Sequence, residues 1–128
     1  MYVFTRNGTQ WTEQQKLTAS DGVALDQFGW RVAISGSTVA VGANFDAVTP
    51  GDKRGSAYVF VRNGTSWDQQ QKLTASDSAT FDEFGYSVAI SGDTLIVGAN
   101  LDENGNPVIL NAGAAYVFTR SGGVWAEE

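Results

Sequence analysis

The chain contains one stretch of 17 residues twice, as FGWRVAISGSTVAVGAN at residues 28–44 and as FGYSVAISGDTLIVGAN at residues 84–100. The similarity extends beyond this stretch. Aligning residues 2–44 with residues 58–100 pairs 43 positions, of which 29 are identical. That identity exceeds what a shared β-rich composition would produce, so the two segments are copies of one structural unit.

A third copy of the YVF motif gives the period of the repeat. The spacing is 56 residues from Tyr2 to Tyr58 and 58 residues from Tyr58 to Tyr116. Periods of this length are typical of propellers and arrays rather than of one compact core. Helical solenoids are excluded because no apolar 3.6-residue period runs for three turns.

Each repeat is predicted to contain four short antiparallel strands. The repeated stretch reads as a hairpin, because Val32 and Ile34 alternate with smaller residues before a turn at Gly36. After the YVF strand, the dipeptide Asn63-Gly64 predicts a type I′ turn. For the first complete unit we expect strands at about 29–35, 38–43, 56–62 and 67–75.

The fold class is therefore expected to be all-β, with β-propeller blades formed by four-stranded antiparallel meanders. In the third strand of the unit, Tyr58 and Phe60 alternate with Ala57 and Val59, so that both faces are apolar. A four-stranded sheet that needs cover on both faces, and whose neighbours are copies of itself, is a propeller blade.

The expected molecule is an incomplete propeller of about two blades plus partial strands. Residues 1–20 are expected to supply the last two strands of a partial blade, with the return strand running from Trp11 to Ser20. Residues 21–77 form a complete blade, and residues 78–128 form a second blade that lacks most of its last strand. A closed propeller takes about four to eight blades. The expected partners are therefore the remaining blades of a parent propeller or copies of this chain.

Composition narrows the function classes. Eight basic and 14 acidic residues give a net charge of −6, which opposes binding to phosphate backbones. We expect no nucleic-acid partner, and no membrane insertion, because no apolar run approaches the roughly 20 residues of a span. The absence of Cys and His removes thiolate chemistry and the commonest general base. If the protein is secreted, its signal peptide is expected outside this chain.

The motifs of the repeat resemble a known family. Phe28-Gly29 with Gly42-Ala43-Asn44, repeated at residues 84–85 and 98–100 and followed each time by a YVF strand, resemble the FG-GAP repeat of integrin alpha-subunit propellers and related bacterial surface proteins. The resemblance covers essentially the whole chain. It implies a seven-bladed β-propeller that is typically extracellular or at the cell surface, used for adhesion or ligand recognition, or carried as an accessory domain.

Two features depart from the family's pattern. The Pro that follows Gly-Ala in the family is replaced by Asn44 and Asn100. Many family members also carry a calcium loop of the DxNxDGxxD type between the two hairpin strands, where this chain has only SGST at 35–38 and SGDT at 91–94. Because Ca²⁺ takes six to eight oxygen ligands, the family's calcium site is expected to be missing from both repeats.

One other loop has the oxygen spacing of a calcium site. Asp102, Asn104 and Asn106 alternate as in the first half of a calcium loop, but the twelfth position from Asp102 is Gly113 and supplies no closing carboxylate. These three residues are the candidate metal ligands. A turn-rich loop without metal is the favoured interpretation, and we expect no cofactor.

The acidic loops between repeats offer a second set of candidates. Asp21 and Asp26 in one repeat, and Asp77, Asp82 and Glu83 in the next, are the kind of carboxylates that glycosidases pair. A catalytic pair is needed once, whereas a loop that accepts backbone hydrogen bonds is needed in every unit. The repetition therefore favours loop capping, and no catalytic residue is expected.

The repeated tryptophans, Trp11, Trp67 and Trp125, suggest either a platform for stacking sugars or packing between blades. A fixed place in every unit favours packing. Together these observations predict a non-enzymatic propeller segment of an extracellular or cell-surface protein, acting in adhesion or in binding a protein or carbohydrate ligand. The alternative is a structural or accessory segment of a larger secreted enzyme whose active site lies elsewhere.

Overall fold

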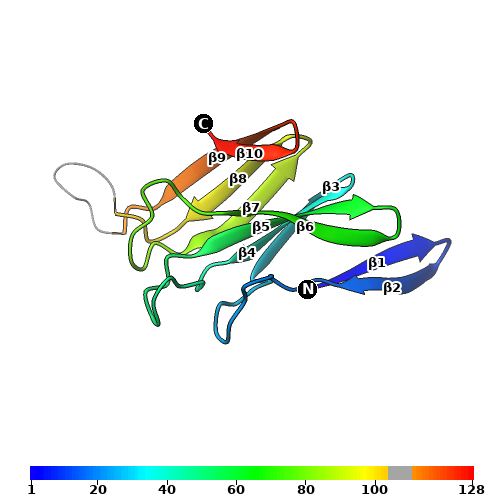
Figure 1. Cartoon of the computed structure of the whole chain (residues 1–128), viewed down its shortest axis with the longest axis horizontal. Coiled ribbons are helices and arrows are strands. Elements are labelled where there is room, and N and C mark those ends of the chain that lie inside the picture. Colours follow the sequence, from blue (N-terminus) through cyan, green and yellow to red (C-terminus); the bar gives the residue numbers. More distant parts are fainter. Residues whose placement is uncertain (104–110) are drawn as a thin grey trace.

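The computed structural model describes residues 1–103 and 111–128, and this part of the chain contains strands and no helix. The strands form three antiparallel sheets (Figure 1). The first is a hairpin of β1 (Tyr2–Asn7) and β2 (Gln10–Lys16). The second contains β3 (Arg31–Ser35), β4 (Thr38–Ala43), β5 (Ser56–Asn63) and β6 (Ser66–Leu73). The third contains β7 (Phe84–Ser91), β8 (Thr94–Ala99), β9 (Ala114–Ser121) and β10 (Val124–Glu127).

Each four-stranded sheet is a meander in which consecutive strands pair. The spatial orders are β3-β4-β5-β6 and β10-β9-β8-β7. In the first hairpin Val32 pairs with Val41 and Ile34 with Val39, as the alternation predicts. The hairpin turn reverses at Gly36, whose φ of +57° lies in the left-handed region that glycine adopts without strain. The all-β class and the four-stranded blades are confirmed.

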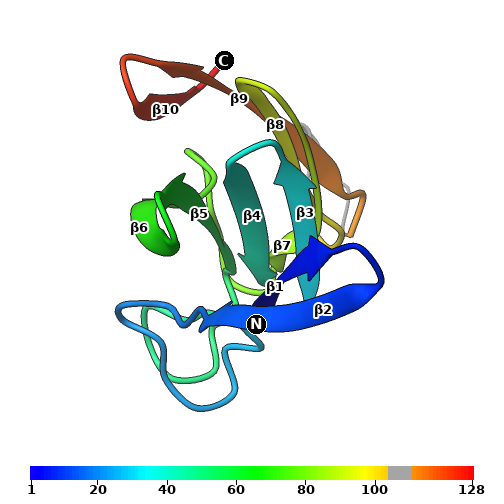
Figure 2. The ribbon, with the colours of Figure 1, turned by 90° about the vertical axis from the view of Figure 1, so that its right-hand side faces the viewer.

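The two four-stranded sheets pack face to face (Figure 2), and the β1–β2 hairpin contributes Val3 to a core cluster with the first of them. Tyr58 and Phe60 of β5 belong to the cluster that also contains Val3 of β1 and Leu17, the residue after β2. Ala57 and Val59 of the same strand belong to the cluster shared with β7–β10. These four β5 side chains are buried. The prediction that neither face of this strand is exposed to solvent is therefore confirmed.

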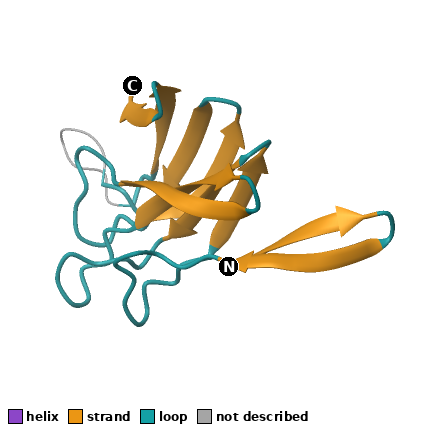
Figure 3. Cartoon of the chain, turned by 45° about the vertical axis from the view of Figure 1, so that its right-hand side comes forward, coloured by secondary structure: helices purple, strands orange, loops and turns teal. Residues whose placement is uncertain are grey.

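The β1–β2 hairpin projects away from the rest of the molecule (Figure 3). Tyr2 and Phe4 occupy the repeat positions of Tyr58 and Phe60, and their side chains are about half exposed. The difference follows from the stacking order: these side chains face the side on which a preceding blade lies in the other repeats. The hairpin thus presents an apolar sheet face to solvent.

Two expected strands end earlier than predicted. The return strand ends at Lys16 rather than Ser20, and β6 ends at Leu73 rather than residue 75. The reason is that the backbone leaves its own sheet to bond to the next one. The amide of Ser20 donates to Gln69 Oε1 at 3.0 Å, and the amide of Ser76 donates to Glu127 Oε2 at 3.0 Å. These segments tie adjacent blades together.

Within the described residues there is no helix of sufficient length and hydrophobicity to span a bilayer.

Candidate functional site

The Phe of the repeated motif anchors each first hairpin on its YVF strand. The ring of Phe84 meets Tyr116 edge-on at a centroid distance of 5.5 Å and Phe118 at 6.0 Å. Phe28 meets Tyr58 and Phe60 at the same two distances. Edge-to-face pairs of this kind add about 0.5–1.5 kcal/mol beyond area burial. The motif Phe is therefore a packing residue in both repeats.

The glycines of the motif let the backbones of two blades touch. A Cβ on Gly85 would lie 2.3 Å from the carbonyl oxygen of Ser56, and a Cβ on Gly42 would lie 2.0 Å from the carbonyl oxygen of Gly85. Next to this contact, the amide of Phe84 donates to the carbonyl of Arg54 at 2.9 Å. The motif residues of consecutive blades thus form one junction, which leaves no room there for a ligand.

Trp67 and Trp125 each form hydrogen bonds with glutamines in the fourth strand of the preceding blade. The indole Nε1 of Trp67 donates to Gln14 Oε1 at 3.0 Å. The side-chain amide of Gln15 pairs with both backbone groups of Trp67, at 2.7 and 2.9 Å. Trp125 repeats this arrangement with Gln70 and Gln71. Packing between blades is therefore confirmed for Trp67 and Trp125.

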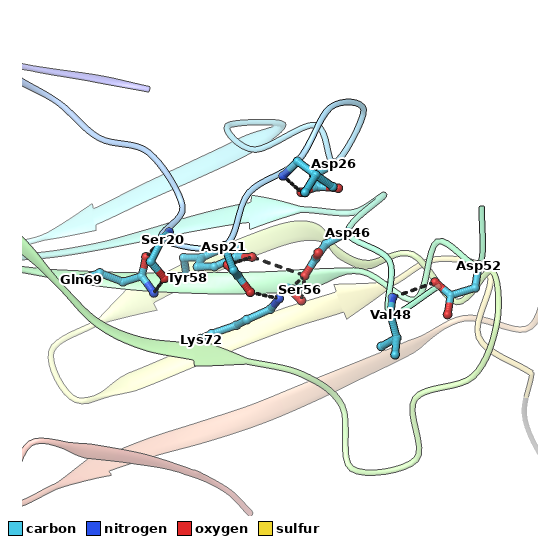
Figure 4. A network of polar contacts seen from close by, with 11 residues as sticks. Ser20, Asp21, Asp26, Asp46, Val48, Asp52, Ser56, Tyr58, Gln69 and Lys72 are labelled. Atoms are coloured by element: carbon cyan, nitrogen blue, oxygen red, sulfur yellow. Dashed lines mark hydrogen bonds and ion pairs between the residues drawn. The ribbon is translucent and has the colours of Figure 1, made fainter. Parts of the chain in front are cut away.

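A polar cluster lies where the loop after β2 meets the next blade, and we call it the Lys72 cluster: Asp21, Asp46, Ser56, Tyr58 and Lys72 (Figure 4). Lys72 Nζ lies 2.6 Å from Asp21 Oδ2 and 2.6 Å from Asp46 Oδ2. The Tyr58 hydroxyl lies 2.9 Å from Asp21 Oδ1 and 3.3 Å from Asp46 Oδ2, and the Ser56 hydroxyl donates to Asp46. The cluster is internally satisfied.

Hydrogen bonding and burial shift three pKa values in the Lys72 cluster, those of Asp21, Tyr58 and Lys72. The hydrogen bond from Lys72 has the largest effect and lowers the pKa of the Asp21 carboxyl. Burial opposes this shift, while the Tyr58 hydroxyl and the charge of Lys72 lower the pKa further. Burial raises the pKa of the Tyr58 hydroxyl. The cluster thus holds an ionised carboxylate and a neutral phenol, which suits a fixed structural bridge.

Replacing Lys72 tests this bridge. Lys72→Met is expected to lower the free energy of unfolding at pH 7 by about 1–2 kcal/mol, because buried Asp46 loses its counter-charge while solvent screens part of the effect. The matched control is Lys16→Met. Lys16 is the repeat counterpart of Lys72 and lies over the ring of Tyr2 at 5.7 Å, on an exposed hairpin. Equal losses in urea melts of both variants would contradict the prediction.

The stability difference between the native chain and Lys72→Met is expected to depend on pH. Because the pKa of Asp21 is lower in the folded state, its contribution to stability is present above the unfolded pKa of about 4 and is lost as the pH falls through the folded pKa. Acidification from pH 5 to pH 3 should therefore destabilise the native chain more than Lys72→Met. A difference that stays constant over this interval would show that Asp21 is not coupled to Lys72.

The second repeat brings two predicted site residues together. The Tyr116 hydroxyl lies 2.7 Å from Asp77 Oδ1 and 2.6 Å from Asp102 Oδ2. Asp102 is buried, and its carbonyl accepts from the amide of Gly113 at 3.0 Å. Asn104 and Asn106, the other two candidate metal ligands, lie outside the described residues. Among the residues described, no three His, Cys, Asp or Glu side chains are grouped as metal ligands would be.

We expect calorimetric titration with millimolar Ca²⁺ to show no heat of binding. The carboxylate of Asp102 already accepts the Tyr116 hydroxyl, and the sequence provides no closing bidentate carboxylate for this loop. A saturable heat that disappears in Asp102→Asn would contradict this expectation and would make the loop a cation site.

The remaining loop carboxylates cap their own loops. Asp26 Oδ2 accepts the amide of Val23 at 2.6 Å, and Asp82 Oδ2 accepts the amide of Ala79 at 2.5 Å. Burial raises the pKa of Asp82, and the nearby charges of other carboxylates add to the shift. These two aspartates occupy the same repeat position and make the same contact, which is the capping role that the repetition favours.

The structure also shows a cavity that the sequence reasoning missed. It has a volume of about 690 Å³ and lies between the loop that precedes β3 and the loop that joins β4 to β5. We call it the loop pocket. Its lining is mostly apolar and contains one cationic side chain, that of Lys53. The lining includes Val23, Leu25, Gln27, Phe45, Val48 and Lys53. The signal was available as three apolar residues, Val23, Ala24 and Leu25, inside a loop that reads as acidic.

Comparison with known proteins agrees with this geometry. The model of the FG-GAP repeat family matches residues 11–60 and 67–118, which together cover most of the chain. No curated protein matches the chain. The two matched segments contain the two motif phenylalanines, Phe28 and Phe84, together with the tyrosines that their rings contact, Tyr58 and Tyr116. The chain belongs to the FG-GAP repeat family.

Proposed function

We propose that this chain is a non-enzymatic β-propeller segment of an extracellular or cell-surface protein, and that it acts in adhesion or ligand binding through the loops of its blades. The observation that carries the proposal is the loop pocket. Val23, Leu25 and Val48 are among the most exposed large apolar side chains described, and all three line it. Apolar side chains that gather around a cavity at the loop edge favour recognition of a partner.

The polar side chains near the loops support a binding role over a catalytic one. Lys72 is ion-paired with both Asp21 and Asp46, and Asp26 accepts a backbone amide. A general acid or base needs a carboxylate, or another titratable group, within reach of a substrate. These groups are committed to blade stacking and loop capping, so the proposal assigns no reaction to this chain.

A second candidate function rests on the exposed sheet faces. One exposed face carries Tyr2 and Phe4, whose repeat counterparts in the central blade, Tyr58 and Phe60, are buried. The other exposed face carries Ile96 and Val117, whose counterparts, Ala40 and Val59, are also buried. We propose that these faces pack against the remaining blades of a parent propeller or against copies of the chain. In that case the segment serves as a structural or accessory part of a larger secreted enzyme whose active site lies elsewhere.

Adhesion is tested with beads coated with the chain and passed over an array of purified extracellular proteins and glycans. Retention under flow is expected on at least one surface, and it should be lost when Val23, Leu25 and Val48 are all replaced by Ser. Trp11→Ser is the control, because it removes an exposed apolar side chain of β2 that does not line the loop pocket. Retention that is absent, or that persists in the triple variant, would overturn adhesion through these loops and favour the accessory role.

A further inference from the structure

The loop pocket has the size of a small-molecule site. Its volume of about 690 Å³ lies within the range of roughly 300–1,000 Å³ that is usual for such sites. Two loops form its walls. The amide of Phe45 donates to the carbonyl of Asp26 at 3.2 Å, which joins the two loops through two of the lining residues. The walls are therefore held together by the fold and do not depend on a ligand to meet.

Several apolar side chains that line the pocket are exposed to water, which is unfavourable. Leu25 is 86% exposed and Val48 is 80% exposed, while most large apolar side chains of the blades are buried. Removing such a side chain from water is favourable. A ligand with an apolar body would recover part of this free energy by covering both side chains.

Backbone strain is concentrated at the same place. Leu25, Gln27 and Lys53 have φ values of +80°, +59° and +44°, and all three line the pocket. A left-handed conformation is strained for a residue that carries a Cβ. The other described non-glycine residues with positive φ are the repeat counterparts of these three, Phe81, Glu83 and Asn111. The repeat thus preserves a strained loop that presents an apolar side chain, Leu25 or Phe81.

The pocket has one cation for which the described residues provide no ion-pair partner. Lys53 Nζ lies 4.0 Å from the centroid of the Phe45 ring, and none of the ion pairs between described residues involves Lys53. Asp26, the carboxylate of the lining, is buried and accepts the amide of Val23. An apolar cavity with one available ammonium is complementary to an apolar molecule that carries one negative charge.

We infer that the loop pocket binds a small apolar carboxylate, with its aliphatic or aromatic body against Val23, Leu25 and Val48 and its carboxylate on Lys53. The inference rests on the proposed ligand-binding function and names the ligand class of that function. Lys53 supplies the charge recognition. The net charge of −6 repels anions at long range, so binding at low ionic strength gains nothing from steering.

The test is a titration of the ¹⁵N-labelled chain with sodium octanoate, followed by amide chemical shifts. Saturable shifts are expected at Val23, Leu25, Val48 and Lys53, with no change at Phe4 on the exposed sheet face. The probe 1-octanol has the same chain without the charge, and it should bind at least five-fold more weakly. Shifts confined to β1, equal affinity for both probes, or no shift at all would overturn the inference.

Two variants separate charge recognition from loop integrity. Lys53→Gln should reduce octanoate affinity to that of octanol, and Leu25→Asp should weaken both probes by ten-fold or more. The amide spectrum of each variant away from the loops reports whether the blades remain folded. Unchanged octanoate affinity in either folded variant would count against the inference.

The bead assay tests adhesion, and the titration tests the carboxylate site, so either result can be negative without the other. Loop-dependent bead retention without octanoate shifts at the pocket would leave the proposed function standing and remove the carboxylate. Octanoate binding at the pocket without bead retention would leave the carboxylate site standing and remove adhesion.

Discussion

Gly85→Ala is expected to lower the free energy of unfolding by about 3 kcal/mol or more. The added Cβ would lie 2.3 Å from the carbonyl oxygen of Ser56 and 3.2 Å from the amide nitrogen of Ala43. Both are backbone atoms of the preceding blade, so no change of rotamer relieves the contact and the two blades must separate. Because φ at Gly85 is +91°, the alanine also carries backbone strain. Urea denaturation followed by circular dichroism measures the loss.

The repeat provides the matched control for this variant. Gly29 is the counterpart of Gly85, its φ is +95°, and a Cβ there meets only the side chain of Met1 at 4.0 Å. Gly29→Ala therefore carries the backbone strain without the collision, and it should cost about 1 kcal/mol. The difference between the two variants isolates the contact between blades. Equal losses would show that the junction does not hold the blades together.

Much of the fold could be predicted because the physical causes are local. Alternation of Val32 and Ile34 with smaller residues defines the first hairpin, and a YVF strand that is apolar on both faces requires a blade on each side. The fixed place of Trp67 in the repeat predicted packing between blades. The ends of β2 and β6 were not predictable in the same way, because the side chains that draw the backbone away, Gln69 and Glu127, belong to the neighbouring blade.

The candidate site was less predictable than the fold. Asp21 and Lys72 are 51 positions apart, and their contact depends on how far one blade is offset from the next. The loop pocket depends on the positive φ of Leu25 and Lys53. A positive φ is uncommon for leucine and lysine, so the sequence does not predict it. The aspartates of the loop predict the capping that the structure shows. They do not predict the pocket that the apolar side chains between them line.

Trp67→Ala is expected to lower the free energy of unfolding by about 3–5 kcal/mol, as is usual for truncating a buried aromatic side chain. Trp67 is 5% exposed and belongs to the cluster that joins the β1–β2 hairpin to the central blade. Its removal opens a cavity in that cluster, and Gln14 Oε1 loses the indole donor that lies 3.0 Å away. The hairpin should then detach first, which limited proteolysis would detect as early cleavage within residues 17–27.

The control is Trp11→Ala, in the same repeat position. Trp11 is 64% exposed and its ring is contacted by the Arg6 guanidinium at 5.9 Å, an interaction that contributes about 0.5–1 kcal/mol at exposed sites. Its replacement should leave stability almost unchanged and the proteolysis pattern intact. Since the two tryptophans share a repeat position and differ in having a preceding blade, the difference between the variants measures what stacking contributes to one position of the repeat. A loss in Trp11→Ala as large as in Trp67→Ala would mean that the tryptophan stabilises its own hairpin rather than the contact between blades.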